Sequence, residues 1–399
     1  GVQVNSLGLT EQQPENNVYR ILVEMLAVTL SKKARARAVQ LPAWNEALGL
    51  PRPWDQQWSM RMQQIMAFET DLLEYEDLFE GNQVVEAKVE SLKASARYEL
   101  ETIETQGGAL NAIDYMKSRL VESNTDRLQN IESNVTTVVG VNKFTKTEKS
   151  PLVSGDGGIM TVDPAVEKDQ IDRLNQWRTN RNEKLVNKAL LSLRQAALHG
   201  KNIMLPSIEA AKAGATTGEW AQEMRNIYGE YRGPTGVATG ISNKTDGLDE
   251  LRSAVDAVSD KLGERLKFLM GKPGLDGHSN GAEQIASRAR DCGMKIEYHG
   301  IRLTPQELVE NVKSTKAHVV GLSILSGSHI PLVQDMINLL AKEGLTKIPI
   351  VVGGIIPEED KIKLLDMGIS KVYTPKDFEM NTIMMDIVNL AEPKEIAAE

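Results

Sequence analysis

The glycine-rich segment 271–281 holds the side chains with the most distinctive chemistry in this sequence. Asp276 and His278 lie two residues apart among four glycines, so the carboxylate can hold one imidazole nitrogen while the other nitrogen faces outward. Metal-ligating histidines are commonly oriented by a carboxylate in this way. His278 is therefore a candidate metal ligand, with Asp276 as its orienting partner. The Asp-x-His pair alone leaves open a solvated loop with an incidental histidine.

Two further short motifs follow at defined distances. There are 41 residues between Gly281 and Ser323, which begins an S-x-L pattern with Leu325, and 27 residues between Leu325 and the pair Gly353 and Gly354. Seven specified positions at nearly fixed spacing arise by chance in far fewer than about one chain in a million. Together the three motifs resemble the cobalamin-binding signature D-x-H-x-x-G, S-x-L and G-G.

The elements around these motifs indicate a parallel sheet in an α/β domain. Two of the apolar segments, 317–325 and 348–354, are nearly continuous, as is typical of parallel strands covered on both faces. Such domains bind ligands at the carboxyl edge of the sheet, and the loop 271–281 follows a strand. Five βα units predict a flavodoxin-like, doubly wound domain with strands at 265–270, 294–299, 317–325, 348–354 and 370–374, and helices beginning near 281, 305, 330, 358 and 377.

The resemblance implies a role for each motif residue at the cofactor. His278 would take the lower axial position on cobalt, Asp276 would fix its tautomer, and Lys272 would be the next partner of Asp276. We take Asp276 and Lys272 as the catalytic candidates. The glycines would leave room for the flat nucleotide tail of the cofactor. The cofactor-binding candidates of this domain are Gly277, His278, Gly281, Ser323, Leu325, His329, Gly353, Gly354 and Thr374.

The other histidines are weighed one by one. His329 follows a predicted strand at its carboxyl end, so contact with the corrin side chains and a structural role are both open. His299 ends a predicted strand and His318 begins one, which favours structural roles. His199 has no acidic neighbour in the sequence and is expected at a helix end.

A second resemblance covers the first part of the chain. Residues 6–17, 39–58 and 67–82 resemble the end of the catalytic barrel in the methylmalonyl-CoA mutase family, and most closely its ethylmalonyl-CoA mutase branch. Residues 202–233 resemble the belt that joins this barrel to the cobalamin domain. The resemblance implies an active site inside a (β/α)8 TIM barrel, capped at one end by adenosylcobalamin.

Two residues of this part are carried over as cofactor contacts. Gln3 and Glu46 match positions that contact the adenosyl group and the corrin in the family, and the residues 46–48 that define the Glu46 motif are intact. The positions next to Gln3, residues 4–7, depart from the family pattern. For Glu46, a carboxylate at a helix entry is the alternative.

Periodicity predicts the remaining architecture. Residues 1–80 form two βα units with extended runs at 1–8 and 38–41, each followed by a helix whose apolar stripe belongs in the core. Those stripes are Val18, Ile21, Leu22, Met25 and Leu26, then Trp54, Trp58, Met62, Ile65 and Met66. A long helix runs from Pro164 through Leu193. The expected domains are the barrel end (1–80), a helical linker with an irregular crossing at 136–163 and a lead-in at 234–262 (81–262), and the cobalamin-binding domain (263–399).

Composition limits the partners and the compartment. The net charge is −9 and no basic stretch is interleaved with aromatics, which argues against nucleic acid. No apolar run reaches the roughly 18 residues of a membrane span and no signal peptide is visible, so we expect a cytoplasmic protein away from membranes. The lone Cys292 excludes an internal disulfide and a multi-thiolate zinc site, and is expected to pack as a small apolar residue.

The reaction implied by the resemblance is a radical rearrangement of an acyl-CoA, from ethylmalonyl-CoA to methylsuccinyl-CoA, in which the thioester group migrates to the neighbouring carbon. Methylmalonyl-CoA mutase and a cobalamin-binding carrier without chemistry are the alternatives. The chain lacks an initiator Met and begins inside a strand-like run. We therefore expect a piece of a longer enzyme that needs an N-terminal barrel portion, in the same or a companion chain, and that forms a homodimer.

Overall fold

The computed structural model describes residues 1–153, 157–160, 163–237, 248–377 and 379–393. The chain divides into two compact units, one formed by Gly1–Met160 with Pro234–Glu399 and the other by Thr161–Gly233. Each unit is considered by itself below. Parts of the predicted crossing and of the predicted lead-in, residues 154–156, 161–162 and 238–247, lie outside the described residues.

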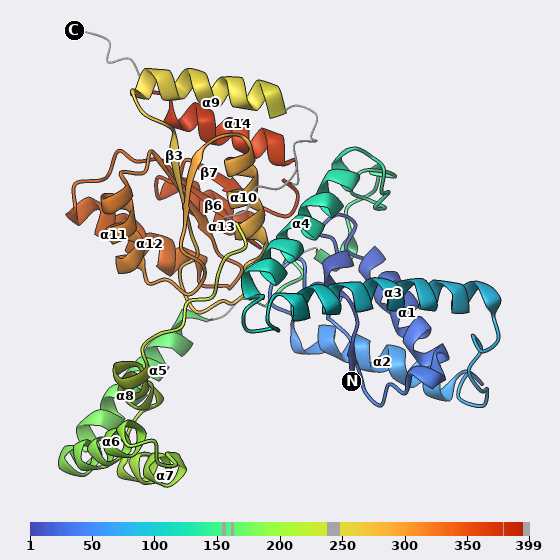
Figure 1. The fold of residues 1–399 in the computed structure, drawn as a ribbon, viewed down its shortest axis with the longest axis horizontal. Helices are drawn as coiled ribbons and strands as arrows, with labels where there is room; N and C mark the ends of the chain where they lie inside the picture. The colour runs from blue at the N-terminus through green and yellow to red at the C-terminus, as the bar shows by residue number, and fades with distance from the viewer. Residues whose placement is uncertain (154–156, 161–162, 238–247, 378, 394–399) are drawn as a thin grey trace. The chain divides into compact units, whose positions relative to one another are not determined.

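A five-stranded parallel sheet forms the centre of the carboxyl-terminal part of the first unit (Figure 1). Its order is β4-β3-β5-β6-β7, so the chain reverses direction across the sheet between β3 and β5, which is the switch point where such sheets bind ligands. The predicted flavodoxin-like topology is confirmed. The strands are β3 (Lys267–Gly271), β4 (Lys295–Tyr298), β5 (Val319–Ser323), β6 (Ile350–Gly353) and β7 (Lys371–Tyr373).

Helices cover both faces of this sheet because successive strand residues point to opposite sides. Phe268 and Met270 of β3 pack with α9, α10 and α14 on one face, while Leu269 packs with α11, α12 and α13 on the other. The helices are α9 (Leu248–Leu262), α10 (Asn280–Asp291), α11 (Pro305–Thr315), α12 (His329–Lys342), α13 (Glu358–Asp366) and α14 (Met380–Ala391). The last of these begins later than predicted, because Asp377 accepts a hydrogen bond from the Thr374 N–H and closes a turn there.

The amino-terminal part of the first unit contains the two predicted βα units. Strands β1 (Val2–Gln3) and β2 (Val39–Gln40) pair in parallel, and α1 (Asn16–Leu30) and α2 (Pro53–Phe68) follow them. The predicted apolar stripes are only partly buried. Leu22, Trp54 and Ile65 are exposed, which corrects the expectation that whole stripes enter the core. The buried cluster here consists of Ile21, Met25, Trp44, Met62 and Met66.

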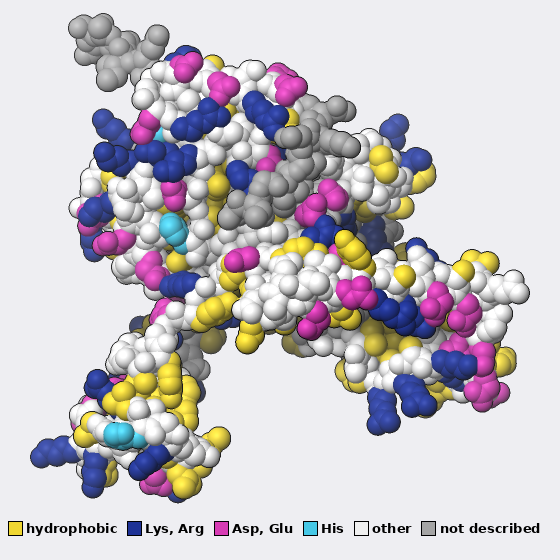
Figure 2. Space-filling model, in the orientation of Figure 1, with side chains coloured by type: hydrophobic (Ala, Val, Ile, Leu, Met, Phe, Trp, Pro, Cys, Tyr) yellow, Lys and Arg dark blue, Asp and Glu magenta, His cyan; other side chains and the backbone are white. Residues whose placement is uncertain are grey.

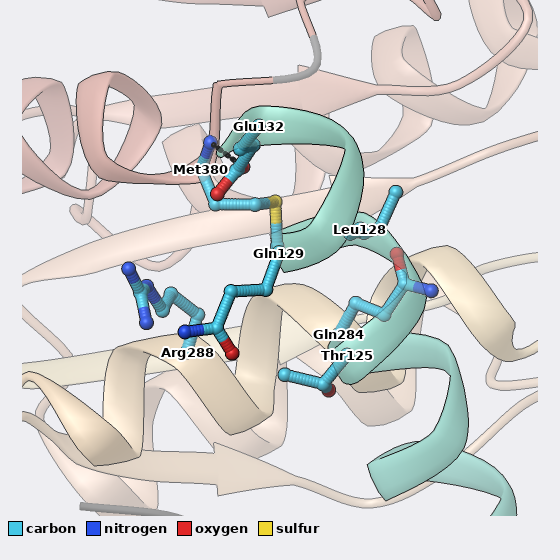
Figure 3. Close-up of a pocket in the computed structure, with 7 residues that line it drawn as sticks. All are labelled: Thr125, Leu128, Gln129, Glu132, Gln284, Arg288 and Met380. Atoms are coloured by element: carbon cyan, nitrogen blue, oxygen red, sulfur yellow. Dashed lines mark hydrogen bonds between the residues drawn. The ribbon is translucent and has the colours of Figure 1, made fainter. Parts of the chain in front are cut away.

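Two long helices follow in the same unit. No residue of α3 (Gln83–Thr105) is buried, although the structure describes this helix in full. In contrast, α4 (Ile113–Glu132) packs on α10, where Lys117 forms a 2.7 Å ion pair with the buried Glu283. A small pocket opens beside this contact (Figure 3), and in it Glu132 accepts a hydrogen bond from the Met380 N–H at the start of α14. The remaining short helices are η1 (Ser6–Gly8), η2 (Lys32–Ala34) and η3 (Pro151–Val153).

The second unit is a bundle of four helices, α5 (Pro164–Asn180), α6 (Glu183–Leu198), α7 (Met204–Ala213) and α8 (Thr217–Tyr228). The predicted long helix is therefore two helices. The break falls at Arg181, because Asn182 accepts a hydrogen bond from the Leu185 N–H and caps α6. Many apolar side chains of this bundle are exposed, as Figure 2 shows. In the described part of the chain, no helix is long and apolar enough to cross a membrane.

Candidate cobalamin site

The loop that follows β3 forms a linear relay of three side chains. The Lys272 Nζ lies 2.6 Å from Oδ2 of Asp276, and Nδ1 of His278 lies 2.7 Å from the other carboxylate oxygen, Oδ1. A carboxylate only accepts hydrogen bonds, so Nδ1 is the donor, and in the neutral imidazole Nε2 keeps its lone pair. The Lys272 side chain is fully buried, whereas 83% of the His278 side chain is exposed. The relay thus runs from the interior to an imidazole that faces outward.

The electrostatics keep the central carboxylate ionised. Burial alone would raise the pKa of Asp276, but hydrogen bonds from Lys272 and from the backbone and ring of His278 outweigh it and lower the pKa to about 2. The backbone N–H of His278 also donates to Oδ1 of Asp276, at 3.0 Å. This second bond turns the loop back on itself and limits the positions that the imidazole can reach.

The stem of the loop is held by the segment before α11. The Gly274 N–H donates to the carbonyl of Leu303, and the Leu303 N–H donates to the carbonyl of Lys272. Gly274 has a φ of +88°, a conformation that favours glycine. Lys272 therefore stays in line with β3, and its ammonium group lies within hydrogen-bonding distance of Asp276.

The sheet brings the other predicted motifs to the same edge. Ser323, the last residue of β5, pairs with Gly353, the last residue of β6, and Gly353 pairs in turn with Tyr373 of β7. Thr374 follows directly. Ser323 and Thr374 are buried and Leu325 is half-buried. The Thr374 hydroxyl already accepts a hydrogen bond from the Lys376 N–H, so it has a local partner.

The predicted glycines differ in what surrounds them. A methyl group added to Gly281 would meet nothing within 4 Å, and one added to Gly353 would only reach Tyr373 at 4.0 Å. At Gly354 the same methyl would lie 1.9 Å from the carbonyl oxygen of Ile324. A glycine is therefore required at position 354, because the chain after β5 and the chain after β6 lie too close together there for a side chain. Gly281 and Gly353 leave open space instead, which fits a flat group lying against the chain.

A second imidazole–carboxylate pair lies at this edge, and the sequence did not predict its partner. His329, at the start of α12, is buried, and its Nε2 lies 2.9 Å from Oδ2 of Asp360. Asp360 also pairs with Lys363 at 2.7 Å. The Nδ1 of His329 is buried and has no hydrogen-bond partner among the described residues. An acidic residue in the first turn of α13 was visible in the sequence, but helix starts often carry one, so that signal was weak.

Of the other histidines, His318 lies at the amino end of β5, His299 at the carboxyl end of β4, and His199 at the end of α6. His318 accepts a hydrogen bond from the Lys267 N–H on Nδ1 at 2.9 Å and faces Glu264, which gives it a structural role as predicted. His299 is exposed just after β4. His199 ends α6, as predicted.

The two amino-terminal candidates are both exposed. Gln3 lies on β1, and Glu46 lies in a turn well before α2, which begins at Pro53, so the helix-entry alternative for Glu46 is wrong. The turn that carries Glu46 approaches the sheet edge near Gly327. A methyl group added to Gly327, in the loop between β5 and α12, would lie 3.7 Å from Cδ1 of Leu50 at the end of the Glu46 turn.

Comparison with known proteins agrees with this arrangement. The family model described as B12 binding domain matches residues 266–375, so the sheet and its edge define a B12-binding domain. The model described as methylmalonyl-CoA mutase matches residues 2–230. The chain belongs to the methylmalonyl-CoA mutase family.

Three relatives show how the chain is placed within that family. It is 66% identical over 399 residues to ethylmalonyl-CoA mutase of Cereibacter sphaeroides, and 58% identical over 395 residues, 98% of this chain, to ethylmalonyl-CoA mutase of Methylorubrum extorquens. Identity to methylmalonyl-CoA mutase of Escherichia coli is 30%, over 97% of this chain and 55% of that protein. The chain spans 61% and 57% of the lengths of the first two relatives.

Proposed function

We propose that this chain is part of an adenosylcobalamin-dependent carbon-skeleton mutase that converts ethylmalonyl-CoA to methylsuccinyl-CoA. The observation that carries the proposal is the relay of Lys272, Asp276 and His278 at the carboxyl edge of the sheet, with its imidazole exposed. The family and the 66% and 58% identities to ethylmalonyl-CoA mutases support the choice of substrate. The rest of the barrel, in the same or a companion chain, would supply the acyl-CoA pocket.

The residues present fit a bound cobalamin. His278 would hold the cobalt through Nε2, because Asp276 occupies Nδ1, and the buried Lys272 would keep Asp276 charged and in place. The open space beside Gly281 and Gly353 would receive the nucleotide tail, next to Ser323, Leu325 and Thr374. Gln3 and Glu46 would approach the adenosyl side.

The bound cofactor supplies radical chemistry through its cobalt–carbon bond. The chain's own contribution is to hold and orient that group and to exclude water from it. The family's methylmalonyl-CoA substrate is a second candidate, which the lower 30% identity makes less favoured. A cytoplasmic location is supported by the single cysteine, which is buried and free.

A cobalamin titration tests the ligand assignment. We expect His278→Ala to weaken adenosylcobalamin binding by about 10–100-fold, because the cobalt loses its protein ligand. His199→Ala is the matched control, since His199 is exposed and follows α6 in the second unit rather than a strand of the sheet. Unchanged affinity in His278→Ala would contradict the assignment.

Turnover then separates the remaining possibilities. The chain reconstituted with the missing barrel portion is expected to turn over ethylmalonyl-CoA faster than methylmalonyl-CoA. Cobalamin binding without any turnover in the reconstituted sample would favour a carrier. Light scattering on the same sample tests the expected homodimer.

A further inference from the structure

The turn that carries Glu46 is built on a buried carboxylate. Asp55 is fully buried in α2, and its Oδ1 accepts a hydrogen bond from Nε1 of Trp44 at 2.9 Å. Its Oδ2 accepts one from Nδ2 of Asn45 at 2.8 Å. Trp44 and Asn45 are themselves buried, and Glu46 is the next residue and is exposed. The two residues before Glu46 are therefore both anchored on one side chain.

A second segment holds the same turn from the other side. Nδ2 of Asn45 also donates to the carbonyl of Gly158 at 2.6 Å, and the Met160 N–H donates to the carbonyl of Leu50 at 2.8 Å. A methyl group added to Gly49 would lie 3.2 Å from Cγ2 of Ile159. The turn is thus enclosed between α2 and residues 158–160, and few of its backbone angles are free to change.

Capping of α2 does not by itself explain this arrangement. Asp55 accepts hydrogen bonds from the Arg52 N–H at 2.8 Å and from its guanidinium, which satisfies the start of the helix. The bonds from Trp44 and Asn45 are additional, and both come from the residues that precede Glu46. Burial opposes ionisation of Asp55, yet the hydrogen bonds from Arg52 and from Trp44 lower its pKa below the usual value. A charged, fully paired acceptor is a rigid anchor.

We infer that Asp55, through Trp44 and Asn45, is a positioning residue that presents Glu46 to the adenosyl group of the bound cofactor. The inference rests on the proposed function, because it assumes the cofactor contact of Glu46. A turn that is fixed in advance avoids the entropic cost of ordering it when the cofactor binds. Leu50, at the end of the same turn, lies near Gly327, where an added methyl group would be 3.7 Å from its Cδ1, so the turn reaches the edge of the B12-binding domain.

The test uses the full-length enzyme and two cobalamins. Trp44→Phe removes one hydrogen bond but keeps the aromatic ring, and Asp55 Oδ1 retains the Arg52 guanidinium at 3.0 Å, so the variant should fold. We expect adenosylcobalamin to bind about 5-fold more weakly and methylcobalamin, which lacks the adenosyl group, to bind as before. Trp58→Phe is the control, because Trp58 packs on Trp44 but makes no hydrogen bond to Asp55.

A double variant distinguishes positioning from general stability. Glu46→Gln should lower the ratio of the adenosylcobalamin affinity to the methylcobalamin affinity. Adding Trp44→Phe to Glu46→Gln should have little further effect on this ratio if Trp44 acts through Glu46. Hydrogen exchange of amides 43–50 should be faster in Trp44→Phe than in Trp58→Phe. If Glu46→Gln lowers the ratio while Trp44→Phe is inert or additive, the positioning role is overturned and the proposed function stands. If Glu46→Gln leaves the ratio unchanged, the Glu46 contact fails and the inference with it.

Discussion

The carboxylate of Glu11 lies 2.7 Å from the ammonium group of Lys376 and joins the segment before α1 to the segment after β7. Only 13% of the Glu11 side chain is exposed. Burial raises the pKa of Glu11, and the hydrogen bond from Lys376 opposes that effect. The same bond raises the pKa of Lys376. This ion pair ties the amino-terminal βα units to the sheet edge that carries the cobalamin motifs.

Removing the cation of this pair should weaken that connection. We expect Lys376→Met to lower the free energy of unfolding by about 1–3 kcal/mol, because Glu11 stays buried without its partner. Lys342→Met, at the exposed end of α12, should change it by less than about 0.5 kcal/mol. Hydrogen exchange of the α1 amides measures the stability of the amino-terminal βα units. Equal effects of the two variants would show that the pair does not contribute.

Loss of the buried lysine in the cobalamin relay should be more costly. Lys272→Met leaves Asp276 without its ammonium partner, and breaking a buried pair costs about 3–5 kcal/mol. The pKa of Asp276 should rise from about 2 toward its usual range. Hydrogen exchange of the β3 amides measures the stability. Combining Lys272→Met with Asp276→Asn should recover part of the loss, and a fully additive double variant would argue against the pair.

The two glycines of the G-G motif should respond in opposite ways to alanine. The Gly353→Ala variant is expected to be as stable as the wild type, because the new methyl group has room. It is expected to bind cobalamin about 10-fold or more weakly, because the methyl group would occupy space proposed for the nucleotide tail. Gly354→Ala is expected to lose about 3 kcal/mol or more, because its methyl would collide with the carbonyl of Ile324. Thermal unfolding and cobalamin titration of both variants test this. Normal cobalamin affinity in Gly353→Ala would argue against a ligand at that position.

Acid should weaken the second unit through one carboxyl group. Hydrogen bonds from Arg181, at 2.6 and 2.7 Å, lower the pKa of Glu219 to about 2 from an ordinary value of 4.5. A carboxyl group whose pKa is lower in the folded than in the unfolded state stabilises the fold at pH values above the pKa of the unfolded state. The contribution of Glu219, about 1–2 kcal/mol for this partly exposed pair, should be complete above about pH 4.5 and decline as the pH falls toward 2.

Hydrogen exchange of α8 amides across this pH range measures the effect. Glu219→Gln should remove that part of the pH dependence and lower the stability at pH 7. Glu209→Gln, on the exposed side of α7, should leave both unchanged. A wild-type profile that is flat between pH 5 and pH 2.5 would contradict the prediction.

Much of the carboxyl-terminal domain could be predicted from local patterns. The runs 317–325 and 348–354 are almost continuously apolar because both faces of β5 and β6 are covered, and a run of consecutive apolar residues is visible in the sequence. The pairing of Asp276 with His278 was predictable because the two residues lie close together in one loop, whereas the role of Lys272 was implied by the family resemblance. In the amino-terminal part the pattern was less reliable, and Trp54 and Ile65 lie exposed on a helix whose stripe predicted burial.

The sequence by itself therefore determined the strand and helix positions of the B12-binding domain, and the pairing of Asp276 with His278 after β3. The tertiary structure decided that Asp55 anchors Trp44, that Asp360 holds His329, and that Gly354 rather than Gly353 is sterically required. The physical reason is the range of the interactions. Periodicity and turn chemistry depend on neighbours in the chain, whereas the partner of a buried polar group is set by which distant segments the packed core brings within hydrogen-bonding distance.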